Sequence, residues 1–158
     1  MAAAGDKHRP VRGFVRNVDF YSDRDFYCLG VDVKVSDKYL LNLLRQVVSA
    51  RASGHCEFPG CSNTECDPHH WRSKKNLVIR YDPDACLYLC TWHHTGNTMS
   101  AHLNPEGFEI AIIKSGVRTQ VWADAVEQKK NLIITGFKKP FMETCKWQLE
   151  DELRRIAA

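Results

Sequence analysis

Metal-binding residue types are concentrated in one segment of this 158-residue chain. Of its seven cysteines and seven histidines, all except His8, Cys28 and Cys145 lie between His55 and His102. Because the N-terminus lacks the apolar run of a secretion signal, we expect a cytoplasmic protein in which disulfides do not form. In such a reducing environment, a cluster of thiols and imidazoles indicates bound metal.

Four of these residues have the spacing of a closed zinc site. Cys56 and Cys61 enclose a Pro-Gly turn, and Cys90 and His93 follow as a second pair separated by two residues. Tetrahedral zinc takes four ligands of this kind and then has no open position. The sequence therefore predicts a structural Zn²⁺ ion, which would stabilise a segment with too little apolar content to fold alone.

Two further cysteines compete for places in this site. Cys66 lies five residues after Cys61 and could replace it as a ligand. Cys86 opens the strand-like pattern Cys-Leu-Tyr-Leu-Cys, so it shares a strand face with Cys90 but lies too far along it for the same ion. We expect Cys86 to be part of the buried core.

A pair of adjacent histidines, His69 and His70, lies outside the predicted zinc site. Adjacent side chains on an extended strand point to opposite sides. If the strand bends locally, one histidine can bind a metal while its neighbour acts as a base near neutral pH. The alternative is that both histidines belong to a single structural zinc cluster.

The segment from Cys56 to Phe108 resembles the HNH nucleases, and in particular phage-type members with a zinc knuckle. The stretches DPHHWRS, RYDPDACLYLC, His93-His94 and AHLNPEGF occur in the order of that family's motifs, over about a third of the chain. The resemblance implies an α+β fold with a ββα-metal core and structural zinc. It also implies metal-dependent hydrolysis of DNA in phage recombination, repair or processing, within the cytoplasm of a bacterial host.

Carried over by position, the resemblance implies one catalytic divalent ion held by His69, His94 and His102. His70 would be the general base that takes a proton from water, and Arg72 would hold the scissile phosphate. The ion would stabilise the charge that develops on the phosphate and the leaving oxygen. Three imidazoles suit Zn²⁺, Ni²⁺, Mn²⁺ or Co²⁺ better than Mg²⁺, which prefers oxygen ligands.

One position departs from the family pattern. The central asparagine of the family would fall at Ala85, whose side chain makes no hydrogen bond. Asp84 could substitute by a shift of one residue, or the loop could be braced differently. The departure favours a second hypothesis, a catalytically inactive zinc-knuckle module that binds DNA. A third is a purely structural partner in a larger recombination complex. The expected protein partners are recombination proteins or a second copy of the chain, as a homodimer.

Basic residues follow the histidine pair and predict a DNA-binding surface. They are Arg72, Lys74, Lys75 and Arg80. The alternative is a solvated loop, and the net charge of +3 permits a nucleic-acid partner without requiring one. No apolar run of about 18 residues occurs, so we expect no membrane partner.

The remaining chain must position these groups. Residues 1–10 are expected to be a disordered lead-in and residues 11–52 a β-hairpin, over 11–35, plus a helix that packs on the core. Residues 53–115 form the expected nuclease module, and residues 116–158 a helical C-terminal extension. The expected fold class is thus α+β, with hairpin and helix before the core and helices after it.

Helix signals place the main boundaries. Ser36 or Asp37 caps a helix that runs to about Ala52, and Ser53-Gly54 ends it. Asn104-Pro105 begins another helix. The predicted apolar stripes of these two helices comprise Leu40, Leu41, Leu44, Val47 and Val48 in the first and Phe108, Ile112 and Ile113 in the second.

The C-terminal region predicts two more helices. One runs from about residue 118 to 130, with Val121, Trp122, Ala125 and Val126 apolar, followed by a strand or extended connector over 132–137. Pro140 precedes a final amphipathic helix, whose candidate packing residues are Trp147, Leu149, Leu153 and Ile156. We expect Trp71, Trp92 and Trp122 to pack in the core around the metal segment rather than to stack on bases.

Overall fold

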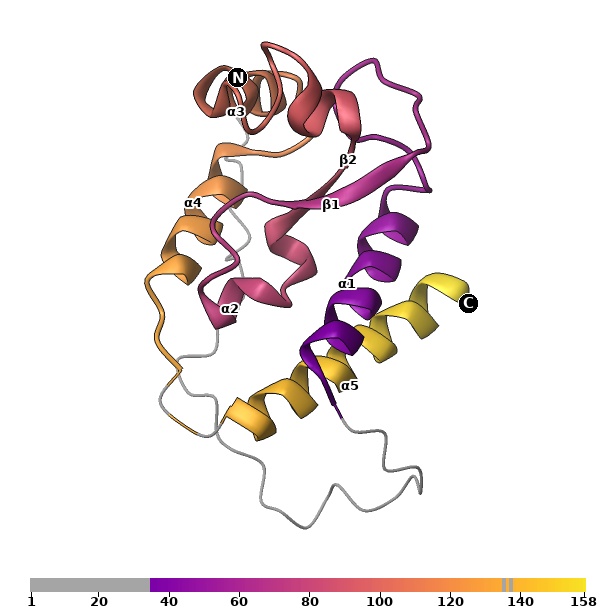
Figure 1. Ribbon diagram of the computed structural model, residues 1–158, viewed down its shortest axis with the longest axis vertical. Coiled ribbons are helices and arrows are strands. Elements are labelled where there is room, and N and C mark those ends of the chain that lie inside the picture. Colours follow the sequence, from indigo (N-terminus) through magenta and orange to yellow (C-terminus); the bar gives the residue numbers. More distant parts are fainter. Residues whose placement is uncertain (1–34, 135, 137) are drawn as a thin grey trace, which may run out of the picture. The chain divides into compact units, whose positions relative to one another are not determined.

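The computed structural model describes residues 35–134, 136 and 138–158, which form a two-stranded antiparallel sheet and several helices (Figure 1). An α+β protein is therefore confirmed. The predicted lead-in and the hairpin of residues 11–35, except Val35, lie outside the described residues. The elements are α1 (Asp37–Arg51), β1 (Cys66–His70), α2 (Leu77–Arg80), η1 (Pro83–Ala85), β2 (Cys86–Cys90), η2 (Trp92–Gly96), α3 (Pro105–Lys114), α4 (Gln120–Lys130) and α5 (Lys138–Ala157).

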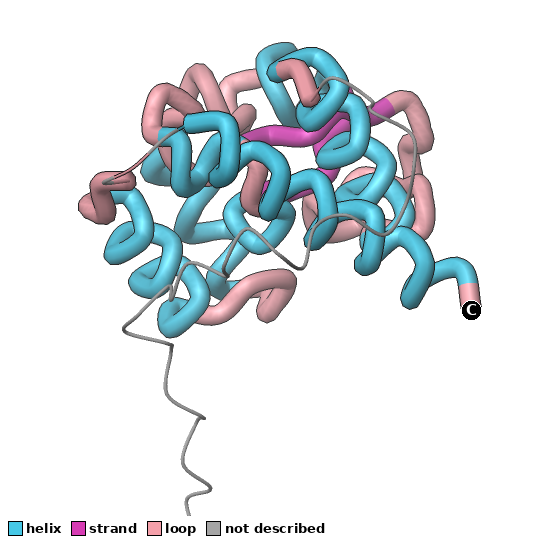
Figure 2. The backbone as a smooth tube through the Cα atoms, turned by 90° about the horizontal axis from the view of Figure 1, so that it is seen from below, coloured by secondary structure: helices cyan, strands magenta, loops and turns pink. Residues whose placement is uncertain are grey.

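The two strands pair so that the metal-binding residue types lie at their ends. In the antiparallel register Cys66 is opposite Cys90, and His70 is opposite Cys86. Strand β2 is buried along its whole length, whereas β1 is half exposed after Cys66. Figure 2 shows the two strands lying among the helices. The sheet thus presents the histidines of β1 on a surface that solvent can reach.

Helix α1 begins and ends as the sequence predicts. The Ser36 hydroxyl accepts a hydrogen bond from the backbone N–H of Tyr39, which satisfies one free donor of the first turn. At the other end, Ser53 and Gly54 have positive φ angles of 51° and 73°. This left-handed turn lets the Gly54 N–H donate to the carbonyl of Ser49 at 2.8 Å and closes the helix. The buried residues of α1 are Leu40, Leu43, Leu44, Val47 and Val48.

Helix α5 packs along α1 and differs in part from its prediction. Its buried residues are Met142, Cys145 and Leu149. The prediction that Trp147 and Ile156 are packing residues was wrong, since they are 57% and 41% exposed. The helix also starts at Lys138 rather than after Pro140, which its first turn tolerates because N–H groups there need no helical partner.

Helices α3 and α4 begin at side-chain caps. Asn104 accepts from the Gly107 N–H, and Thr119 accepts from the Trp122 N–H. The second cap places the start of α4 at Gln120, slightly later than predicted. Within residues 132–137, the described residues are not in a strand, so the connector interpretation holds for them. Val121 was expected on the apolar face of α4 but is 76% exposed.

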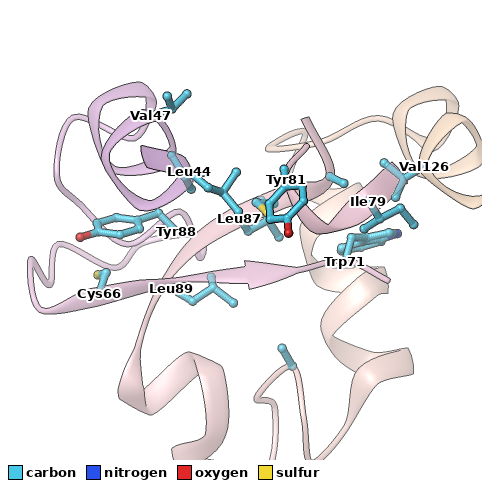
Figure 3. Packing of buried hydrophobic residues seen from close by; sticks show 14 of the residues in the cluster. Leu44, Val47, Cys66, Trp71, Ile79, Tyr81, Leu87, Tyr88, Leu89 and Val126 are labelled. Atoms are coloured by element: carbon cyan, nitrogen blue, oxygen red, sulfur yellow. The ribbon is translucent and has the colours of Figure 1, made fainter. Parts of the chain in front are cut away.

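The core lies between the sheet and the surrounding helices (Figure 3). It combines Leu44 and Val47 of α1 with Leu87 of β2, and Ile79 of α2 with Val126 of α4. Trp71 is buried and Trp122 partly buried, as expected, but Trp92 is 62% exposed and its assignment to the core was wrong. Among the described residues, every helix is too short or too polar to cross a membrane.

Two candidate metal centres

Four residues come together with the geometry of a tetrahedral zinc site. Each of Cys56, Cys61, Cys90 and His93 offers a ligand atom, and these atoms lie within 4.8 Å of one another. The Cys61 and Cys90 sulfurs are 4.0 Å apart, and the His93 Nδ1 lies 3.3 Å and 3.6 Å from the sulfurs of Cys90 and Cys56. Zinc bonds of about 2.3 Å to sulfur and 2.0 Å to nitrogen place tetrahedral ligand atoms about 3.5–3.8 Å apart. The four residues therefore fit a structural zinc ion.

Backbone hydrogen bonds between residues close in sequence shape this zinc knuckle. The Cys61 N–H donates to the carbonyl of Phe58 across the Pro-Gly turn, and the Cys56 N–H donates to Asn63. Gly60 has a φ angle of 73°, which favours glycine. The ring of Phe58 stacks on His93 at 4.1 Å between ring centroids and orients the imidazole. The turn and this stacking hold the two halves of the site in place.

Burial and hydrogen bonding shift the pKa values of two knuckle thiols in opposite directions. Burial raises the pKa of the Cys56 thiol to about 12, because the low-dielectric surroundings disfavour the thiolate. Burial alone would also raise the pKa of Cys90, but the backbone N–H of His93 and the neighbouring thiol of Cys56 lower it on balance. A bound divalent ion would stabilise both thiolates.

The two competing cysteines do not join the four ligands. The Cys66 thiol lies across the sheet from Cys90 and donates to the carbonyl of Asn63 at 3.2 Å. Cys86 is buried, as expected, and its thiol donates to the carbonyl of Asp82. Burial raises the pKa of Cys86, which keeps it a neutral core residue.

Three histidines form a second centre. The ligand nitrogens of His69, His94 and His102 lie within 4.8 Å of one another, and the Nε2 atoms of His94 and His102 are 3.1 Å apart. His69 projects from β1, His94 from η2 and His102 from the loop before α3. The backbone N–H groups of Ala101 and His102 donate to the carbonyls of His93 and His94. These hydrogen bonds bring His102 next to His94 although the two residues are far apart in sequence.

This second centre is open, and two of its imidazoles have lowered pKa values. His69 and His94 are half-buried, and His102 is exposed. Burial, followed by the charges of His94 and His102, lowers the pKa of His69 to about 3. Burial also lowers the pKa of His94. Imidazoles that stay unprotonated near neutral pH keep a lone pair for a metal, and three protein ligands leave positions for water or substrate.

His70 follows His69 on β1 and is held by a main-chain acceptor. Its Nε2 lies 3.1 Å from the carbonyl oxygen of Arg80. A carbonyl only accepts, so Nε2 carries the proton and the neutral ring keeps its lone pair on Nδ1. Burial lowers the pKa of His70, and the charge of Lys74 adds to this effect against the opposing hydrogen bond to Arg80.

The predicted basic residues divide into two groups. Arg72 forms ion pairs with Glu109 and Glu127, and Arg80 forms a bidentate pair with Asp37. Lys74 and Lys75 are exposed, and the charge of Lys74 contributes to the lowered pKa values of both His70 and His94. Both arginines are therefore engaged with carboxylates, whereas Lys74 and Lys75 stay exposed to solvent.

The loop at Ala85 is braced without a side-chain amide. Ala85 is fully buried, and its carbonyl accepts from the Trp71 N–H at 2.9 Å. The carboxylate of Asp84 bonds Arg51 on α1. Contacts from α4 complete the brace, since Lys129 pairs with Asp82 and the Trp122 indole donates to the Asp84 carbonyl.

Comparisons with known proteins identify no relative of this chain. No protein-family model, no curated protein and no solved structure matches the chain. The function of the chain is therefore inferred from the chemistry of the two centres.

The sequence did not predict the contacts of Lys129 and Trp122 with the Ala85 loop, because both residues lie on a later helix with no local motif.

Proposed function

We propose that the chain is a metal-dependent endonuclease that hydrolyses DNA phosphodiester bonds, as its resemblance to the HNH nucleases implies. The observation that supports this best is the open centre, in which the ligand nitrogens of His69, His94 and His102 lie within 4.8 Å of one another. A zinc ion that serves only folding already has four suitable ligands in this chain. They are Cys56, Cys61, Cys90 and His93. A second group of imidazoles with free coordination positions serves chemistry better than structure.

His69, His94 and His102 would hold the catalytic ion. When bound, a divalent ion polarises the phosphate and offsets the charge that develops on the leaving oxygen. Three imidazole ligands favour Zn²⁺, Ni²⁺, Mn²⁺ or Co²⁺ over Mg²⁺. The exposed side of His102 leaves room for a phosphate to approach.

His70 is the proposed general base. The Arg80 carbonyl accepts the proton of Nε2, which fixes the ring and leaves Nδ1 to take a proton from water. Because burial lowers the pKa of His70, the imidazole stays neutral at physiological pH and can accept that proton. The exposed ammonium groups of Lys74 and Lys75 attract the phosphate backbone. Arg72 acts as a positioning residue that orients the end of β1 through Glu109 and Glu127.

The first prediction compares the wild type with His70→Ala in a cleavage assay. The substrates are plasmid, single-stranded and branched DNA, each with Mg²⁺, Mn²⁺, Co²⁺, Ni²⁺ or Zn²⁺. We expect the wild type to cleave with at least one ion and His70→Ala to lose about 10²–10⁴-fold in rate, the usual contribution of a general base. His55→Ala is the matched control, because His55 is exposed and belongs to neither centre.

Two results would contradict this assignment. Wild-type protein that cleaves no substrate with any ion would exclude the nuclease, provided that the closed centre is loaded with zinc. Cleavage by His70→Ala at the wild-type rate would keep the nuclease and remove His70 as its base.

Ala85 supports the second candidate, a DNA-binding module without catalysis. The buried methyl group of Ala85 leaves the loop to be braced by the main chain and by α4. For this candidate we expect salt-dependent DNA binding with no cleavage in the same assay.

A further inference from the structure

The exposed side of α1 carries polar groups suited to reading DNA bases. Its solvent face presents Asn42, Arg45 and Gln46, with Ser49 one turn further on. These residues border a shallow hollow of about 470 Å³, whose lining also includes Tyr88 and the helix end at Ser53 and Gly54. The lining contains a guanidinium, two side-chain amides and two hydroxyls from serine, and no carboxylate. The face is therefore compatible with a polyanion.

The end of α1 shapes this hollow. The left-handed residues Ser53 and Gly54 turn the chain away from the helix, so α1 is not continued over the sheet. The nearly buried ring of Tyr88 comes from β2 and links the hollow to the core. The polar side chains thus stand on a rigid helix whose opposite side is fully packed.

Arg45 connects this helix face to the open histidine centre. Its Nη2 lies 2.9 Å from Oδ1 of Asp67 and 3.5 Å from the carbonyl oxygen of Cys66. Asp67 precedes His69 by two residues on β1, so both side chains leave the strand on the same side. Arg45 neutralises the carboxylate that would otherwise repel a phosphate backbone on its way to the centre.

We propose that the α1 face, defined as Asn42, Arg45, Gln46 and Ser49, binds duplex DNA and reads its base edges beside the cleavage site. This rests on the proposed function. Amide side chains recognise adenine and guanidinium groups recognise guanine in the major groove, which is wide enough to admit a helix. The exposed pair of Arg45 with Asp67 is weak enough to be exchanged for a base or phosphate.

Selection from a random-sequence duplex pool tests this surface without requiring cleavage. Zinc-loaded protein is incubated with the pool without added divalent ions, and the retained DNA is sequenced. We expect the wild type to enrich particular bases and the double variant Asn42→Ala, Gln46→Ala to lose about tenfold or more of that discrimination. Alanine favours helix at these exposed positions, so the variant keeps α1. Gln128→Ala is the matched control, an exposed glutamine on α4.

The outcomes separate this proposal from the nuclease itself. Absence of enrichment by the wild type, or equal enrichment by the double variant, would overturn base reading by α1. Competition by duplex RNA as strong as that by duplex DNA would overturn it too, because the A-form major groove excludes side chains. If the double variant loses enrichment and no cleavage is found with any ion, the recognition surface stands and the nuclease fails. If cleavage is found and the double variant enriches bases as strongly as the wild type, the nuclease stands and the recognition surface fails.

Discussion

His93 and His94 are neighbours in the chain, yet each belongs to a different candidate metal centre. His93 joins three thiols in a closed set of four ligands, which suits a tightly held structural ion. His94 joins two imidazoles in a set that leaves coordination positions free. One turn of chain, η2, thereby couples the stability of the knuckle to the geometry of the open centre. Loss of the structural zinc should therefore disturb both sites.

Replacing one knuckle ligand tests this assignment at the scale of a residue. We expect Cys61→Ser to lose tightly bound zinc and to melt at a lower temperature, because structural zinc contributes directly to folding. Metal analysis after dialysis and thermal melting are the measurements. Cys66→Ser is the matched control, since a serine hydroxyl can still donate to the carbonyl of Asn63. If Cys66→Ser loses zinc and Cys61→Ser retains it, then Cys66 rather than Cys61 is the zinc ligand.

The grouping of candidate ligands was predictable from sequence where these residues are close in the chain. The spacing of Cys56 with Cys61, and of Cys90 with His93, encodes two local turns, and the structure brings these four residues together. The partners of the predicted phosphate-binding arginine were not predictable. Glu109 and Glu127 reach Arg72 from two later helices, and no local pattern reports such pairs.

Arg72 connects three elements at the scale of secondary structure. It follows β1 directly and pairs with Glu109 of α3 and Glu127 of α4. Its side chain is 24% exposed, so the ion pairs are partly shielded from water. Without the guanidinium, Glu109 would lose its pair with Arg72, whereas Glu127 would keep its pair with Lys130. The interaction therefore fixes the two helices relative to the strand that carries His69 and His70.

Arg72→Ala should destabilise the fold more than it weakens DNA binding. We expect the free energy of unfolding to fall by about 1–3 kcal/mol, and part of this loss to return in Arg72→Ala, Glu109→Gln, which removes one carboxylate. Urea denaturation and duplex binding at fixed salt are the measurements. Lys75→Ala, at an exposed position, should change stability by less than about 0.5 kcal/mol. If Arg72→Ala leaves the stability unchanged but greatly lowers the affinity for DNA, then Arg72 binds the phosphate and is not a positioning residue.

Element boundaries followed local signals, but the buried face of an element did not always do so. The cap at Ser36 and the Ser53-Gly54 end predicted α1 closely. In α5, apolar residues occur on more than one side of the helix, so the pattern alone could not choose between Leu149 and Trp147. Packing against α1 made the choice, since Leu149 is 2% exposed and Trp147 is 57% exposed.

At the scale of the described part of the molecule, α1 joins the C-terminal helix to the metal segment. Tyr39 donates to Glu150, and Arg51 bonds both Glu152 of α5 and Asp84 of η1. Asp37 accepts from Arg80 and Tyr81, which follow the loop after β1. Arg80 also supplies the carbonyl that orients His70. These contacts connect segments far apart in sequence, which is why the sequence predicted helices more readily than their arrangement.

The Asp37 cluster gives stability a specific pH dependence. Hydrogen bonds from Arg80 first, and then from Tyr81, lower the pKa of Asp37 from 3.8 to about 2. A lowered carboxyl pKa stabilises the folded state above about pH 4, and this contribution is lost as the pH falls towards 2. Asp37→Asn should therefore unfold more easily than the wild type above pH 4, and the two unfolding free energies should converge at lower pH. Urea unfolding of both proteins between pH 6 and 2 measures this, with Arg80→Met expected to converge in the same range. A difference that stays constant or widens on acidification would mean that the Asp37 carboxylate does not stabilise the fold.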